Sequence, residues 1–194
     1  GVDYIGYVFL QLSTTLLPFL VLVGANARAA GVFAAIWMMI AMLDTLAHNA
    51  GVPLAAEAAR APAEAAATER AVRWRTLVLV GAAAAIAAVA AWPLLHIFGA
   101  EFAAAGTLTF QLMAAASVPR AYAVISFAAM RAQRKVAPIA AIEATHAALV
   151  LGGCVLLLPQ LGLVAVGIVW LGAQCALAGL CALMRARYTW GKTQ

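Results

Sequence analysis

The sequence predicts an all-α integral membrane protein, built as a bundle of six transmembrane helices. Hydrophobic residues make up 66% of the 194 residues and charged residues 10%, whereas a soluble domain has about 45–50% and about 25%. The second observation is a set of six long apolar stretches, residues 4–23, 29–47, 76–95, 102–130, 136–158 and 161–184. Each is long enough as a helix to cross a hydrocarbon core of about 30 Å.

Basic residues divide unequally between the two ends of such a bundle. If consecutive stretches cross in alternate directions, ten of the twelve Lys and Arg residues share one face, and only Arg28 lies on the other. The ten are Arg60, Arg70, Arg73, Arg75, Arg131, Arg134, Lys135, Arg185, Arg187 and Lys192. Because cytoplasmic loops are enriched in Lys and Arg, we expect a multi-pass protein of the cytoplasmic (inner or plasma) membrane with both termini of this segment cytoplasmic. The net charge of +5 then reflects contacts with lipid headgroups, and no nucleic-acid partner is expected.

The first stretch carries one polar stripe. Gln11, Thr14, Thr15 and Pro18 follow a spacing of three and four residues, which places them on one side of a helix. Two interpretations stay open. The stripe forms interhelical hydrogen bonds beside a proline kink, or it lines a water-filled cavity.

The second stretch ends near a possible polar pair. Asp44 and His48 are four residues apart, so their side chains can contact each other and lower the cost of a carboxylate in the membrane, about 2.5–3.5 kcal/mol at mid-helix. Alternatively, Asp44 simply reaches headgroup water. Residues 50–75 intersperse Ala with Glu and Arg, which predicts short amphipathic helices that lie on the cytoplasmic surface.

The third stretch is apolar and ends at Trp92-Pro93, and the fourth contains the one deep cation. Arg120 precedes Arg131 by eleven residues, about 16 Å of helix, which is too far for its side chain to reach the interface. Pro119 predicts a kink beside it, and Ser117 and Thr109 share its face. Such an Arg is a functional candidate by default, the alternative being a structural partner for an acid or for carbonyls freed by the kink.

The fifth and sixth stretches add fewer polar residues. Glu143 and His146 have the Glu-x-x-His spacing that ligates metals in helical bundles, but that chemistry needs a second such pair and further carboxylates. We therefore expect no metal and no cofactor, and interpret these two residues as a hydrogen-bonded pair or a protonatable site. Gln174 is the main polar interruption of the sixth stretch, and three Cys residues lie in apolar surroundings.

Several segments resemble the polysaccharide flippases, the Wzx-like, O-antigen group of the multidrug/oligosaccharidyl-lipid/polysaccharide exporter superfamily. Residues 94–106, LLHIFGAEFAAAG, resemble the outer loop of that family. Residues 118–121 (VPRA) and 131–135 (RAQRK) resemble its next helix and the cytoplasmic end of that helix. Residues 156–171 are similar to its entrance into the last helix, although their second Gly comes later. At the entry to the first helix, Asp3 departs from the uncharged polar residue that the family pattern leads us to expect.

This resemblance implies that residues 1–194 form one C-terminal transmembrane lobe of a MATE/flippase-like two-lobe transporter, whose N-terminal lobe is missing from this chain. It implies the translocation of polyprenyl-diphosphate-linked oligosaccharide, as in polysaccharide and lipopolysaccharide biosynthesis, by alternating access. A diphosphate that crosses a membrane needs a cationic partner, and Arg120 supplies one. The expected substrate-binding residues are Arg120, Ser117, Thr109, Gln11, Thr14 and Thr15. The candidates for proton coupling are Glu143, His146, Asp44 and His48.

Three other readings compete with the flippase. A multidrug exporter of the same fold would bind cations through buried carboxylates such as Asp44 and Glu143. A membrane enzyme using polyprenyl-phosphate donors would need a polar catalytic loop, and the Ala-rich residues 50–75 do not supply one, so we expect no enzyme. The third is a non-transporting scaffold or degenerate half. In each reading the chain has membrane lipids as partners, and in the flippase reading it also binds a lipid-linked oligosaccharide.

Overall fold

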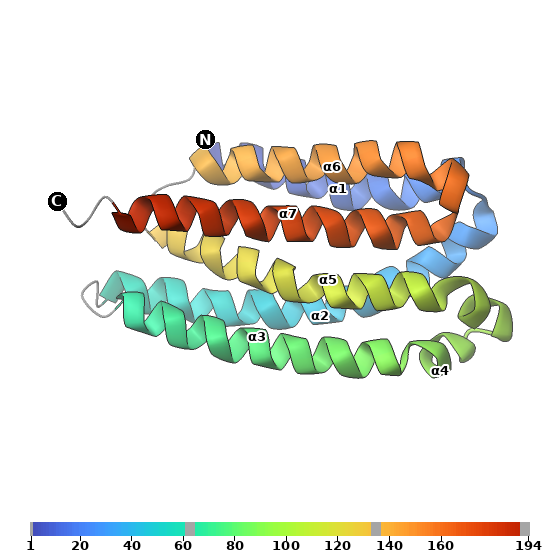
Figure 1. Cartoon of the computed structure of the whole chain (residues 1–194), viewed down its shortest axis with the longest axis horizontal. Helices are drawn as coiled ribbons and strands as arrows, with labels where there is room; N and C mark the ends of the chain where they lie inside the picture. The colour runs from blue at the N-terminus through green and yellow to red at the C-terminus, as the bar shows by residue number, and fades with distance from the viewer. Residues whose placement is uncertain (1, 61–64, 133–136, 191–194) are drawn as a thin grey trace.

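The computed structural model describes residues 2–60, 65–132 and 137–190, and within these ranges the chain forms seven α-helices and no strand. The helices are α1 (Val2–Gly24), α2 (Ala27–Arg60), α3 (Ala65–Val89), α4 (Ala91–His96), α5 (Ala100–Ala132), α6 (Ala137–Leu161) and α7 (Leu163–Trp190). Figure 1 shows the long helices running side by side along one axis of the molecule. The predicted all-α class is therefore confirmed.

Five helices contain segments that are long and apolar enough to cross a membrane. These segments are Ala27–Asn49, Arg70–Val89, Ala100–Arg131, Ala137–Leu161 and Leu163–Arg185. Many large apolar side chains on them point outward, among them Ile86, Val89 and Leu156, as lipid contact requires and as a soluble surface rarely shows. The chain is thus a multi-pass membrane protein. In α1 the described apolar segment is the shorter Thr14–Gly24, so the predicted sixth span stays a prediction.

Helix α5 is the centre of the bundle. It packs against α7, α2, α3 and α4, while α6 packs against α7 and α1. The largest side chains buried in the main core include Trp170, Phe33 and Phe110. Close approach of α5 to its neighbours depends on small residues, since a Cβ added at Gly106 would lie 2.7 Å from a methyl carbon of Val32 on α2. A buried α5 is what brings Arg120 into the interior.

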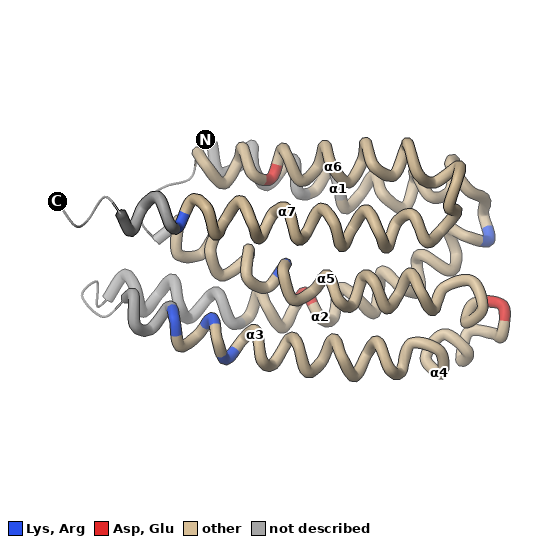
Figure 2. Tube along the Cα trace, in the orientation of Figure 1, with Lys and Arg blue, Asp and Glu red and all other residues tan. Residues whose placement is uncertain are grey.

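Apart from a few charges in the middle of the bundle, the described charges lie toward its two ends, as Figure 2 shows. Arg70, Arg73 and Arg75 lie near the start of α3, and Arg131 and Arg185 near the ends of α5 and α7. The other end holds Arg28, which forms an ion pair with Glu101. The predicted assignments of Arg60, Arg134, Lys135, Arg187 and Lys192 fall on residues or side chains outside the described part of the chain. Which end faces the cytoplasm stays a prediction.

Where the structure describes them, residues 50–75 do not form the separate short helices that were predicted. Helix α2 continues without a break to Arg60, and α3 begins at Ala65, so these residues belong to two long helices. Their position on the cytoplasmic surface stays a prediction. Ala, Glu and Arg are among the strongest helix formers, so a helix that leaves the apolar region has no local reason to stop. Figure 1 shows the extended α2 and α3 side by side.

The third predicted helix also differs from the structure. The apolar stretch 76–95 is divided: α3 ends at Val89, and the short α4 follows after Ala90. Pro93 lies in the first turn of α4, where a proline costs no hydrogen bond. The connection to α5 passes through Gly99, whose φ of 131° only glycine adopts readily. His96, expected to be an interfacial polar residue, stacks on Trp92 with ring centroids 4.7 Å apart.

Candidate functional site

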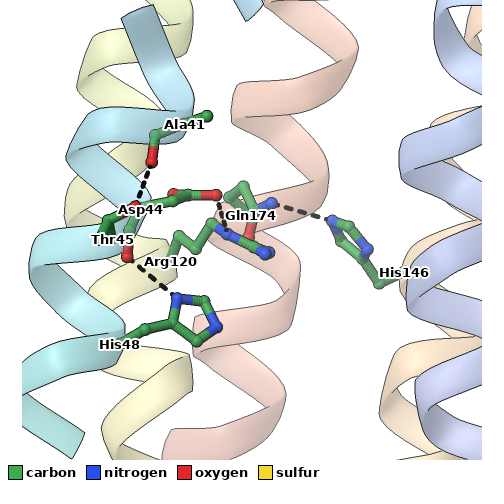
Figure 3. A network of polar contacts seen from close by, with 7 residues as sticks. All are labelled: Ala41, Asp44, Thr45, His48, Arg120, His146 and Gln174. Carbon is green, nitrogen blue, oxygen red and sulfur yellow. Dashed lines mark hydrogen bonds and ion pairs between the residues drawn. The ribbon is translucent and has the colours of Figure 1, made fainter. Parts of the chain in front are cut away.

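An ion pair joins α2 to α5 inside the bundle. Arg120 Nε donates to Asp44 Oδ2 over 2.7 Å, and the two side chains are 8% and 22% exposed. Figure 3 shows the pair together with the polar residues around it. Asp44 is thus the partner of Arg120. A pairing of this Arg with an acid was the structural alternative considered from the sequence. The guanidinium lies inside this bundle and does not face outward toward a second lobe.

The predicted pairing of Asp44 with His48 is wrong at the level of atoms. His48 Nδ1 lies 2.9 Å from the backbone carbonyl oxygen of Asp44, while the carboxylate turns to Arg120 (Figure 3). A guanidinium forms stronger, charge-assisted hydrogen bonds with a carboxylate than a neutral ring does. The imidazole of His48 instead forms a hydrogen bond with the backbone carbonyl of Asp44, one turn earlier in the same helix. Such local bonds to the backbone are common for polar side chains.

The two partners meet because α2 and α5 start at the same end of the bundle (Figure 1). Asp44 lies 17 residues after Ala27 and Arg120 lies 20 residues after Ala100, which corresponds to about 25 Å and about 30 Å along parallel helices. The long Arg side chain covers the difference. Comparing these depths places the two residues at similar levels of the bundle, but it does not show that their side chains face each other.

One aromatic ring lies beside the guanidinium and is itself packed against two others. Its central carbon lies 5.9 Å from the ring centroid of Trp170 on α7, within the range of a cation–π interaction. Trp170 is itself held edge to face by Trp37 on α2, with centroids 5.2 Å apart, and by His146 on α6, at 5.7 Å. Trp170 is buried. Sequence reasoning missed it because an apolar aromatic gives no signal of contact with a cation.

A second polar contact links α6 to α7. Gln174 Nε2 lies 3.1 Å from His146 Nε2, and both residues are buried. The amide therefore donates to Nε2, which leaves the ring proton on Nδ1 in this arrangement. The predicted Glu143–His146 pair does share the buried face of α6, but the hydrogen bond of His146 goes to Gln174. Gln174 was recognised only as a polar interruption of its helix.

Buried polar atoms without a hydrogen-bond partner gather around this contact. Among the described side chains they include Glu143 Oε2, His146 Nδ1 and Gln174 Oε1. The positive charge of Arg120 acts on both Glu143 and His146. The guanidinium bonds Asp44 alone, and the buried polar groups of α6 lie within the reach of its charge without bonding it. Within the described residues, no group of three or more His, Cys, Asp or Glu side chains could hold a metal ion.

Ser117 and Thr109 are buried on α5, like Arg120. Neither hydroxyl has a hydrogen-bond partner among the described residues. Thr109 lies where α7 approaches α5 most closely, because a Cβ added at Gly167 would be 3.2 Å from its Cα. Helix packing already occupies the surroundings of Thr109, so it is a weaker candidate for substrate contact than Ser117.

The predicted stripe on α1 lies elsewhere. Gln11 and Thr15 are exposed and Thr14 is partly exposed on the outside of the bundle, whereas the Arg120 cluster is inside it. The Thr14 hydroxyl donates to the carbonyl of Gln11 within its own helix. The structure therefore does not bring these three residues to Arg120.

The comparisons with known proteins found no match: no family model and no curated protein matches the sequence, and no solved structure matches the fold. The chemistry of the site follows from its own geometry. It offers one guanidinium bonded to a single carboxylate, together with two buried acceptor oxygens, of Glu143 and Gln174, that have no donor among the described residues. Such an arrangement is suited to bind an anion at Arg120 or a cation at Glu143.

Proposed function

We propose that this chain is one lobe of a membrane transporter for a lipid-linked oligosaccharide that carries a diphosphate. The protein moves this substrate between the leaflets by alternating access, with a second lobe opposite. The observation that carries the proposal is the guanidinium of Arg120 inside a membrane-spanning helix. The sugar-lipid class comes from the resemblance of residues 94–106 and 118–121 to polysaccharide flippases.

A purely structural role accounts poorly for the ion pair. Exchanging a buried ion pair for well-packed apolar residues is often neutral or stabilising, so stability alone gives no reason to keep Arg120 and Asp44. Ionisable side chains within membrane spans instead mark the paths of substrates and ions. The neighbouring acceptors without donors, Glu143 and Gln174, point the same way.

The geometry of the guanidinium suits a phosphate ligand. Arg120 bonds Asp44 through Nε alone, and its terminal nitrogens bond no described residue. These two nitrogens form the planar fork that binds phosphate oxygens in pairs. A Lys at this position would keep the charge but not the fork.

An exporter of lipophilic cations is the second candidate. It is favoured by Glu143, which is buried and has a carboxylate oxygen without a partner. The lipophilic cation would bind the carboxylate of Glu143, and Arg120 would then be only a structural partner of Asp44.

The proposal is tested by reconstituting the full-length protein in liposomes with a fluorescent polyprenyl-diphosphate disaccharide. Accessibility of the sugar to an external lectin reports translocation. At equal amounts of folded protein, Arg120→Gln should abolish translocation and Arg120→Lys should leave part of it. Arg28→Gln, which removes an exposed cation at the far end of the bundle, is the matched control and should translocate normally.

Two results would reject the flippase. One is normal translocation by Arg120→Gln. The other is transport of ethidium that Glu143→Gln abolishes and Arg120→Gln spares, because that pattern belongs to the cation exporter.

A further inference from the structure

We infer that Asp44 is a displaceable occupant of an anion site at Arg120, and that a phosphate-bearing ligand binds by taking the place of its carboxylate. This inference rests on the proposed function for the identity of the ligand, a lipid diphosphate. It adds a feature that the function alone does not require: the resting site is filled by a residue of the protein itself.

The bond between the two side chains is a single contact. It joins Nε of Arg120 to one oxygen of Asp44, whereas the strongest Arg–carboxylate pairs use two parallel hydrogen bonds. The terminal nitrogens of the guanidinium bond no described residue, so their donors can bind phosphate oxygens once the carboxylate moves aside.

The two partners are not equally enclosed. The side chain of Asp44 is 22% exposed and that of Arg120 is 8% exposed, so the carboxylate lies nearer the surface of the bundle. His48, one turn further along α2, is exposed and lies against the backbone of Asp44. The acid can therefore turn outward toward a polar neighbour, while the guanidinium has no such path.

The surroundings hold Arg120 in place when Asp44 leaves. Trp170 lies beside the guanidinium and is itself fixed by Trp37 and His146. Figure 3 shows Arg120 between Asp44 on one side and the Gln174–His146 contact on the other. The moving part is thus the acid of α2, and the fixed part is the cation of α5.

Charge balance favours exchange over simple addition. A guanidinium left unpaired inside the bundle is costly, and so is an extra anion beside Asp44. Replacing the carboxylate by a phosphate oxygen keeps Arg120 compensated, and the freed carboxylate of Asp44 turns to the exposed side of α2, where His48 lies one turn further along. Glu143, the other described acid on which Arg120 acts, forms no hydrogen bond with it and is not the group displaced.

The test measures ligand binding by the purified full chain in detergent, through tryptophan fluorescence. The probes are farnesyl diphosphate, inorganic pyrophosphate and, as an uncharged control, farnesol. Asp44→Asn keeps the shape of the side chain and removes its charge, so it should tighten farnesyl diphosphate binding about tenfold, since the ligand no longer breaks a charge-assisted bond. Glu143→Gln, the matched removal of another buried acid, should change the affinity much less, and Arg120→Gln should abolish binding.

The probes also distinguish the source of the phosphate. Tightening for farnesyl diphosphate alone supports a lipid ligand, and equal tightening for pyrophosphate supports a soluble phosphate at the same site. Unchanged or weaker binding by folded Asp44→Asn would overturn the inference, as would equal tightening by Glu143→Gln.

A second measurement uses the unaltered ion pair, in case Asp44→Asn does not fold. The chain has two Asp residues, Asp3 and Asp44, so isotope-labelled aspartate in an Asp3→Asn background gives an infrared carboxylate band from Asp44 alone. Farnesyl diphosphate should shift this band and farnesol should not. Saturating ligand without a shift would refute displacement. Neither assay requires translocation, so failure of the transport test and failure of this inference are separate results.

Discussion

At the scale of single residues, the informative feature is one buried cation with one bonded acid and several other groups around it. Arg120 bonds Asp44, lies beside Trp170, and acts electrostatically on Glu143 and His146. Each of these residues comes from a helix that packs against α5 or α7. The bundle thus concentrates its polar chemistry around one side chain, and substitution of that side chain affects several helices at once.

Removing one partner of the ion pair should destabilise the protein more than removing both. Arg120→Ala leaves Asp44 without its cation, a loss of up to about 3–5 kcal/mol when such a pair is deeply buried and less here because Asp44 is partly exposed. The double variant Arg120→Ala/Asp44→Ala should recover much of that loss. The stability of the single and double variants is measured by thermal unfolding in detergent and by the amount of protein in membranes. If the double variant is no more stable than Arg120→Ala, Arg120 stabilises the protein through contacts other than the ion pair with Asp44.

At the scale of elements, close helix contacts decide where the polar residues meet. Helix α7 approaches α5 at Gly167, where an added Cβ would lie 3.0 Å from Leu112 and 3.2 Å from the Cα of Thr109. Small residues permit such approaches between membrane helices. The contact with backbone matters most, because a side chain can change rotamer and a Cα cannot.

Two glycines of the same helix should therefore respond oppositely to Ala. Gly167→Ala should destabilise the protein by about 1–3 kcal/mol, the usual cost of overpacking a tight contact. Gly172→Ala meets nothing within 4 Å and should be neutral, or stabilising by up to about 1 kcal/mol, because Ala forms helices better than Gly. Thermal unfolding of the two variants compares them directly, and equal midpoints would contradict the packing of α7 on α5.

Element boundaries were predictable only in part. The spans within α2, α5, α6 and α7 agree with the apolar stretches because hydrophobic length is a local property of the sequence. The break at Ala90 and the extension of α2 to Arg60 were not foreseen. The break and the extension depend on the neighbours of a helix and on its own backbone hydrogen bonds. The length of an apolar stretch gives no information about these two properties.

At the scale of the whole molecule, the bundle has a basic end and an end with a neutralised cation. Arg70, Arg73 and Arg75 mark the first, while Arg28 at the other is paired with Glu101 (Figure 2). Because positive charge is retained on the cytoplasmic side, this polarity should orient the protein in the membrane.

Single cysteines at the two ends should label from opposite sides. In a background with Cys154, Cys175 and Cys181 replaced, a Cys at Ala100 should react with an impermeant maleimide in intact cells. A Cys at Ala66 should react only after the cells are opened. The opposite pattern would place the basic end outside and reject the predicted orientation.

The residues themselves determine that this protein crosses a membrane several times and that its charges divide between two ends. Apolar length and Lys/Arg position can be read along the chain without knowing how the helices pack. They also single out Arg120, because the cost of a charge depends on its depth in the membrane and not on its neighbours.

Only the tertiary structure decided which polar residues meet. Asp44 and Arg120 are 76 residues apart, and His146 and Gln174 are 28 apart. In a soluble helix, an apolar stripe shows which face is buried. A membrane helix is apolar toward lipid and toward its neighbours alike, so the sequence carries no comparable signal of which face turns inward, and the partners of Arg120 emerge only when the helices are packed.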